Sequence, residues 1–71
     1  MEGKIVYRIL YLGNPMLAWC EDQKRFIPAG MHLYVTTYDE LDDALKAVKK
    51  VKRACSGWAD EICLDSLKRY I

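Results

Sequence analysis

Apolar residues recur at three- and four-residue steps between Asp39 and Cys55. This spacing places them on one stripe of an α-helix that packs a single face against a core. The stripe consists of Leu41, Ala44, Leu45, Val48, Val51 and Cys55. The pattern therefore predicts one long amphipathic helix over about residues 38–55, with Leu45 and Val48 at the centre of its buried face.

Both ends of this helix carry recognisable signals. Thr37 and Glu40 have the spacing of a capping box, in which a threonine hydroxyl accepts from a first-turn N–H and a glutamate reaches back to the cap. Acidic residues gather in the first turns and basic residues in the last ones, which complements the helix dipole. Gly57 predicts the left-handed residue that closes a helix.

The residues before the helix have the character of β-strands. Residues 4–12 are dense in β-branched and aromatic side chains and end at the turn-forming Gly13-Asn14-Pro15 sequence. Apolar side chains occupy both alternating faces of this segment, as in a strand that is buried on both sides. We therefore expect the first strand here.

A hairpin and a further strand are predicted next. Residues 16–21 form a second strand, the polar residues 21–24 suit a turn, and residues 25–27 return beside it. The sequence Pro28-Ala29-Gly30 breaks that return, and residues 31–38 alternate as a strand does. In that strand Met31, Leu33 and Val35 point one way.

The C-terminal residues 60–71 fit two structures. A strand places Ile62 and Leu64 on the core, whereas a helix places Cys63, Leu67 and Tyr70 on one stripe. We predict a strand over residues 61–65 and leave the last five residues unassigned; the alternative is a second helix across the sheet. The predicted fold class is α+β, a single domain over residues 1–71 with an antiparallel sheet of four or five strands and one long helix.

Composition limits the setting of the protein. The 71 residues, 52% hydrophobic and 30% charged, are typical of a small globular domain near the size at which a core barely repays chain entropy, so a homo-oligomer is expected. The three cysteines form no Cys-x-x-Cys pair, which favours a reducing, cytoplasmic location. The short apolar run after Met1 ends at Arg8 and resembles neither a signal peptide nor a membrane span, so no membrane partner is expected.

Catalytic and metal-binding patterns are weak. His32, the only histidine, could in principle activate Cys20 or Cys63, but lone strand cysteines are more often small core residues. One histidine and scattered cysteines make no metal-ligand set, and the single glycines draw no phosphate-binding loop. We therefore predict no enzyme activity, no metal site and no cofactor.

The second half of the helix is rich in bases. Residues 46–53 carry five of them, a density that nucleic-acid-binding helices also show. The net charge is only +1, however, and such a face is equally typical of a solvated helix. Nucleic acid remains an alternative partner, and its candidate contacts are Lys46, Lys49, Lys50 and Arg53.

The main functional prediction concerns the sheet. One helix covers one face, and if it covers the side of Tyr7 and Ile9, the other face stays apolar and needs a partner. The predicted partner-binding residues are Val6, Leu10 and Tyr34, ringed by Arg8 and His32, with Tyr34 as the anchor. The sequence thus predicts a non-catalytic protein-binding domain, of the kind that phages and mobile elements use to regulate or inhibit larger proteins. A small oligomer with a ligand or active site at a subunit boundary is a second alternative.

Overall fold

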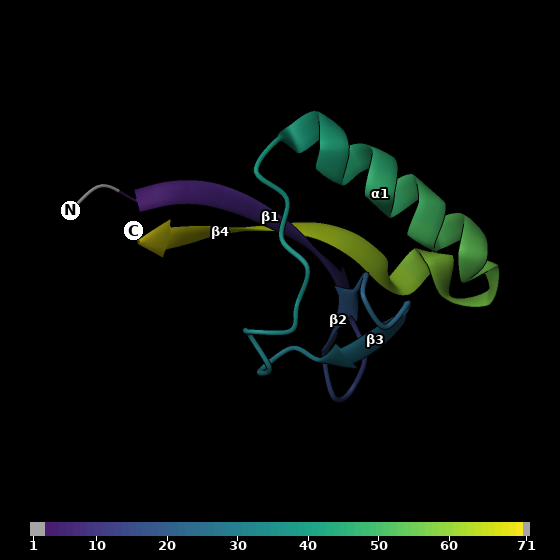
Figure 1. The fold of residues 1–71 in the computed structure, drawn as a ribbon. Coiled ribbons are helices and arrows are strands. Elements are labelled where there is room, and N and C mark those ends of the chain that lie inside the picture. Colours follow the sequence, from purple (N-terminus) through teal and green to yellow (C-terminus); the bar gives the residue numbers. More distant parts are fainter. Residues whose placement is uncertain (1–2, 71) are drawn as a thin grey trace.

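The computed structural model describes residues 3–70, with their side chains up to residue 68. It contains a four-stranded antiparallel sheet in the order β3-β2-β1-β4 and one long helix, which confirms the predicted α+β class (Figure 1). The elements in chain order are β1 (Gly3–Tyr11), β2 (Leu17–Cys20), β3 (Arg25–Pro28), α1 (Leu41–Ala54), the short 3-10 helix η1 (Ser56–Glu61) and β4 (Ile62–Tyr70).

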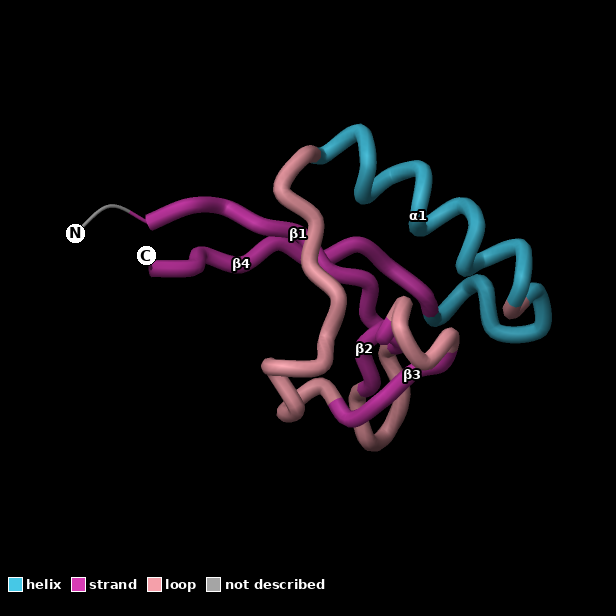
Figure 2. The backbone as a smooth tube through the Cα atoms, in the orientation of Figure 1, coloured by secondary structure: helices cyan, strands magenta, loops and turns pink. Residues whose placement is uncertain are grey.

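Strands β1 and β4 form the longest part of the sheet. They pair along their full length, from Gly3↔Tyr70 to Tyr11↔Ile62. Strand β2 meets β1 only at Leu10↔Ala18 and Tyr11↔Leu17. The first half of β1 and the second half of β4 therefore extend beyond β2 and β3 as a two-stranded ribbon (Figures 1 and 2). The predicted C-terminal strand is confirmed, and it continues beyond residue 65 to Tyr70.

Helix α1 covers one face of this sheet. The core between them contains Ile9, Trp19, Val48, Val51 and Ile62. The predicted helix and the buried position of Val48 are confirmed. Leu45 is not at the centre of the buried face as predicted, because it is 43% exposed, and Ala44 takes that place. The sheet below is narrow, with β4 at its edge, so only the middle of the apolar stripe meets it.

The predicted acidic first turn and basic last turn of the helix are present, but the predicted capping box and the predicted closure at Gly57 are wrong. The helix begins at Leu41 with Glu40 as its cap, and no side chain caps it. Thr37 cannot cap the helix because the next residue, Tyr38, is still extended and exchanges two 2.8 Å backbone hydrogen bonds with Tyr7. At the other end no described glycine has a positive φ; the chain passes through Cys55 into η1 instead of closing at Gly57.

The predicted strand over residues 31–38 is also wrong. Successive turns shape this segment, since the Met31 N–H donates to the Pro28 carbonyl and the Tyr34 N–H donates to the Met31 carbonyl, each at 3.0 Å. Its later part lies over the sheet face opposite α1, where Val35 packs in a second core cluster with Leu10, Ala18, Cys20 and Ile27. The expected uncovered face at Val6 and Leu10 is therefore covered by the chain itself.

Within the described part of the chain, no helix combines the length and the apolar character that crossing a membrane requires.

Candidate functional site

The predicted partner-binding residues do not form one surface. Val6 and Leu10 are buried, at 1% and 5% exposure. Arg8 lies on the same face of β1, and its Nε donates to Asp65 Oδ2 on β4 at 2.9 Å. His32 and Tyr34 are exposed in the loop that covers this face. The structure brings Arg8 and His32 to the wall of one small hollow, of about 170 Å³, and places Val6 and Leu10 inside the protein.

An exposed apolar surface does exist nearby, on the loop that follows β3. Leu33 is 92% exposed and Tyr34 57% exposed, and Met31 is also exposed. The backbone of exposed Met16 lies next to the start of this loop, because its carbonyl accepts from the N–H of Ala29 at 3.3 Å. We call these four residues, Met16, Met31, Leu33 and Tyr34, the loop surface.

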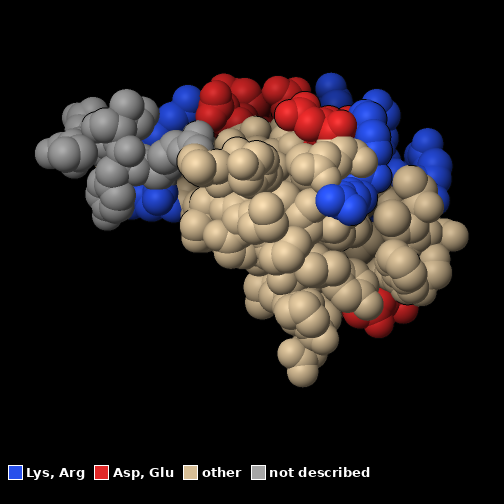
Figure 3. All heavy atoms as spheres, turned by 60° about the horizontal axis from the view of Figure 1, so that its bottom comes forward, with Lys and Arg blue, Asp and Glu red and all other residues tan. Residues whose placement is uncertain are grey.

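The chain segments that carry the loop surface contain no acidic or basic residue other than His32, although Arg8 and Lys68 lie beside the loop at His32 and Val35. Residues 9–20 and 26–38 contain no Asp, Glu, Lys or Arg. Figure 3, in which the bottom of Figure 1 comes forward, shows a broad area without charged side chains; most of the charged side chains lie around it, and one basic group lies within the visible face. These charge-free runs were the sequence signal for the surface. The strand predicted for residues 31–38 concealed it, because alternation there sends Leu33 toward the core.

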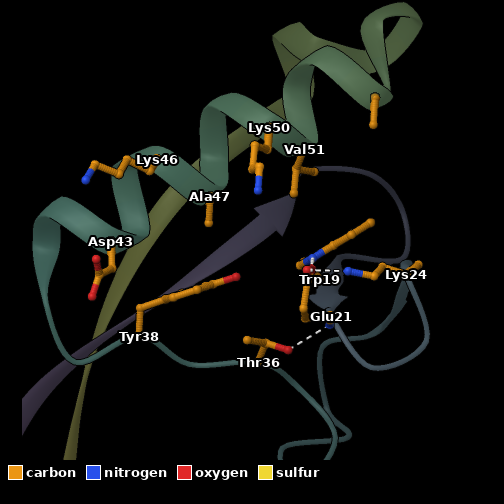
Figure 4. Close-up of a pocket in the computed structure, with 11 residues that line it drawn as sticks. Trp19, Glu21, Lys24, Thr36, Tyr38, Asp43, Lys46, Ala47, Lys50 and Val51 are labelled. Atoms are coloured by element: carbon orange, nitrogen blue, oxygen red, sulfur yellow. Dashed lines mark hydrogen bonds and ion pairs between the residues drawn. The ribbon is translucent and has the colours of Figure 1, made fainter.

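A groove lies on the other side of the molecule, between α1 and the end of β2 (Figure 4). Its volume is about 540 Å³. Apolar walls come from Trp19, Ala47, Val51 and Ala54, together with the ring of Tyr38. The polar residues that line it are Glu21, Lys24, Thr36, Asp43, Lys46 and Lys50.

Hydrogen bonds hold Glu21 at one end of this groove. Trp19 Nε1 donates to Glu21 Oε2 at 2.8 Å, and the Lys24 ammonium donates to Glu21 Oε1. The hydroxyl of Thr36 accepts from the Glu21 N–H at 2.7 Å, which ties the segment before α1 to the end of β2. The bond from Lys24, followed by that from Trp19, lowers the pKa of Glu21, so its carboxylate stays ionised.

The Tyr38 hydroxyl differs from Glu21 because it lacks partners among the described residues. Burial, with a smaller effect of the Glu21 charge, raises the pKa of Tyr38. This phenol therefore keeps its proton at neutral pH and can donate a hydrogen bond. Figure 4 shows its oxygen pointing into the groove.

The candidate polyanion contacts on α1 are divided between two settings. Lys46 and Lys50 line the groove, whereas Lys49 and Arg53 are exposed outside it. In Figure 4 the Lys50 ammonium points into the groove and that of Lys46 points away. The sequence grouped these bases by position along the helix, and the groove distinguishes Lys50 from the others.

Strand β4 is an edge of the sheet, and the hydrogen-bonding pattern of β1 shows which backbone groups of β4 face away from the sheet. The Leu12 N–H donates to the Glu61 carbonyl at 2.8 Å, and Tyr7 directs its N–H and C=O to Tyr38, away from β4. Every second residue of β4 must then direct its backbone groups away from β1. Leu64 and Ser66 are two such residues, and no other described segment bonds to their backbone.

Metal-ligating side chains do not gather in the described part of the chain. No three His, Cys, Asp or Glu residues there form a group that could hold an ion. Cys20 is buried, while Cys55 and Cys63 are half-buried, and all three are free thiols. Comparison with models of protein families, with curated proteins and with solved structures finds no match for this chain.

Proposed function

We propose that this protein is a non-catalytic protein-binding domain that acts in the cytoplasm and binds its partner through the loop surface. The exposure of Leu33, at 92%, is the observation that carries the proposal. Covering a leucine side chain contributes about 1.5–3 kcal/mol, and Leu33 stands in a stretch, residues 26–38, that contains no Asp, Glu, Lys or Arg. The length of the protein, 71 residues, suits a small regulator or inhibitor of a larger protein.

The composition and the support of the loop favour this function. Methionine and tyrosine are enriched at the centres of protein interfaces, and the loop surface presents two methionines and Tyr34 beside Leu33. Buried Val35 follows directly, and the Thr36 N–H donates to the Trp19 carbonyl at 3.1 Å. These contacts hold the loop to the core, which reduces the entropy lost when a partner binds.

The test is a double variant, Leu33→Ser with Tyr34→Ser. An aromatic anchor often contributes about 2 kcal/mol or more to binding, so the affinity for a protein captured from the native host should fall about 30-fold or more. Both side chains are exposed, so circular dichroism should show an unchanged fold. Affinity can be measured by surface plasmon resonance after the captured protein is identified by mass spectrometry.

The matched control is Lys49→Gln with Arg53→Gln, two exposed bases outside both the loop surface and the groove. Binding by this control should stay within about twofold of the parent, since isolated surface charges contribute little. If the control loses binding and the loop variant keeps it, with a steep salt dependence in the parent, a polyanion is the partner and the proposal fails.

Self-association through β4 is a second candidate, because its edge carries unpaired backbone groups. An antiparallel edge strand can pair with the same strand of a second copy about a twofold axis. Exposed Leu41 and Leu45 lie on the flank of α1 opposite the groove and would be covered as the sheet continues. The expected product is a symmetric dimer.

Ser66→Pro tests this dimer with a minimal change. The Ser66 N–H points away from β1, so proline there removes an outward donor and leaves the β1–β4 bonds in place. Sedimentation equilibrium should show a dimer for the parent and for Ser66→Ala, and a monomer for Ser66→Pro. A parent that remains monomeric at about 1 mM rules out this dimer.

A further inference from the structure

The groove below α1 has the size and walls of a small-molecule site. Such sites usually enclose about 300–1,000 Å³ and combine apolar walls with a few polar groups. Here Trp19 lies at the floor of the groove, and α1 forms the opposite wall through Ala47 and Val51 (Figure 4). This site is separate from the loop surface, since the residues that line it include none of the four that define that surface.

Of the groups that point into the groove in Figure 4, those without partners are donors; the carboxylate of Asp43 also lines the groove without a partner, but it points away from Lys50 and the Tyr38 oxygen. Both oxygens of Glu21 already accept, one from Trp19 and one from Lys24. The ammonium of Lys50 and the hydroxyl of Tyr38 point into the space (Figure 4), and neither forms a hydrogen bond or ion pair with a described residue. Glu21 attracts Lys50 only through space. A ligand that completes this arrangement must supply an acceptor.

The charge of the lining indicates how much negative charge that acceptor carries. Three lysines face two carboxylates, those of Glu21 and Asp43, so one positive charge remains. Lys24 is paired with Glu21, and Lys46 and Asp43 both point away at the far end of the groove, which leaves Lys50 as the cation available inside. A single negative charge on the ligand would balance the groove.

We propose that this groove binds a flat organic monoanion, an aromatic carboxylate, with its carboxylate at Lys50 and Tyr38 and its ring against Trp19 and Val51. The carboxylate accepts from the ammonium and from the phenol hydroxyl. The ring would cover the apolar walls of the groove, where aromatic pairs of ligand and indole add to the burial of apolar area. Both halves of such a ligand therefore find a partner in the groove.

The experiment compares 2-naphthoate with its neutral analogue, 2-naphthamide, by two-dimensional ¹H–¹⁵N NMR titration. The naphthoate should shift the NMR signals of the Trp19 indole N–H and of the backbone amides of residues 46–51. These shifts should saturate at a naphthoate concentration in the millimolar range or below. The amide should bind at least about tenfold more weakly, because it lacks the charge that strengthens a hydrogen bond to an ammonium.

Two variants and one control locate the site. Lys50→Gln and Tyr38→Phe should each weaken naphthoate binding, by about tenfold for the charge and severalfold for the hydroxyl. Lys49→Gln removes the same charge one residue away, outside the groove, and should change the affinity by less than about twofold. Lys50 is exposed, so the fold should persist in Lys50→Gln, and unchanged amide spectra away from the groove will verify this.

The proposal would be overturned by the absence of saturable shifts with naphthoate, by equal binding of the amide, or by equal loss of affinity in Lys49→Gln and Lys50→Gln. Shifts that centre on the loop surface would also contradict it, since they would indicate unspecific apolar binding there. Protein binding through the loop surface does not depend on this outcome, because none of these three substitutions changes that surface.

Discussion

Replacing Trp19 by alanine should lower the free energy of unfolding by about 3–5 kcal/mol, the usual cost of deleting a buried aromatic side chain. Trp19 is 7% exposed and lies in the core below α1 with Val48 and Val51. Its ring also meets Phe26 edge to face at a centroid distance of 5.2 Å. A domain of this length typically has only about 4–10 kcal/mol of stability, so the variant should be largely unfolded at 37 °C. Urea titration followed by circular dichroism measures the loss.

Trp58→Ala is the matched control, because the chain has two tryptophans and they differ in burial. Trp58 is 57% exposed and makes a ring contact with Tyr11, at a centroid distance of 6.0 Å. Its removal should therefore cost only about 0.5–1.5 kcal/mol. Equal costs for the two substitutions would mean that α1 does not pack on Trp19 as the structure shows.

The parts of the fold that follow from the sequence are those with a local cause. The spacing of Ala44, Val48 and Val51 predicts the helix whatever it packs on, and the density of β-branched residues predicts β1. The turn at residues 21–24 has polar residues between two apolar runs, and it forms with Lys24 in the left-handed region, at a φ of 54°. In each of these cases, residues that are neighbours in the sequence carry enough information to predict the local structure.

The failures have a tertiary cause. Whether Leu45 is buried depends on how wide the sheet is below it, and no feature of residues 39–55 encodes that width. The capping box at Thr37 and Glu40 is a good local signal, but two backbone bonds from Tyr38 to Tyr7 override it. Residues 31–38 alternate like a strand, yet turns that begin at Pro28 and Met31 occupy their first half, and only Tyr38 pairs with β1, at Tyr7.

The prediction of the candidate functional surfaces was limited in the same way, because tertiary contacts decide which side chains are exposed. Tyr34 and His32 are exposed, as predicted. The patch predicted around them also required Val6 and Leu10 to be exposed, and both are buried. The covering segment is the loop that carries Tyr34 itself. The groove joins residues from β2, from residues 36–38 and from α1, so no motif in one stretch of sequence could reveal it. The lysine-rich pattern of α1 included Lys50, without indicating that it differs from Lys49.

Ile9→Ala should cost about 2–5 kcal/mol of unfolding free energy, and Ile5→Ala should cost about 1 kcal/mol or less. Both isoleucines lie on β1 and on the same face of the sheet, so strand propensity and the deleted atoms are matched. Ile9 is fully buried between α1 and the sheet, whereas Ile5 is 49% exposed on the part of the ribbon that extends beyond β2. The difference between the two urea midpoints therefore reports whether α1 packs over the middle of β1. If Ile5→Ala is the more damaging change, the helix covers the ribbon instead, and both the groove and the exposed flank at Leu45 are misplaced.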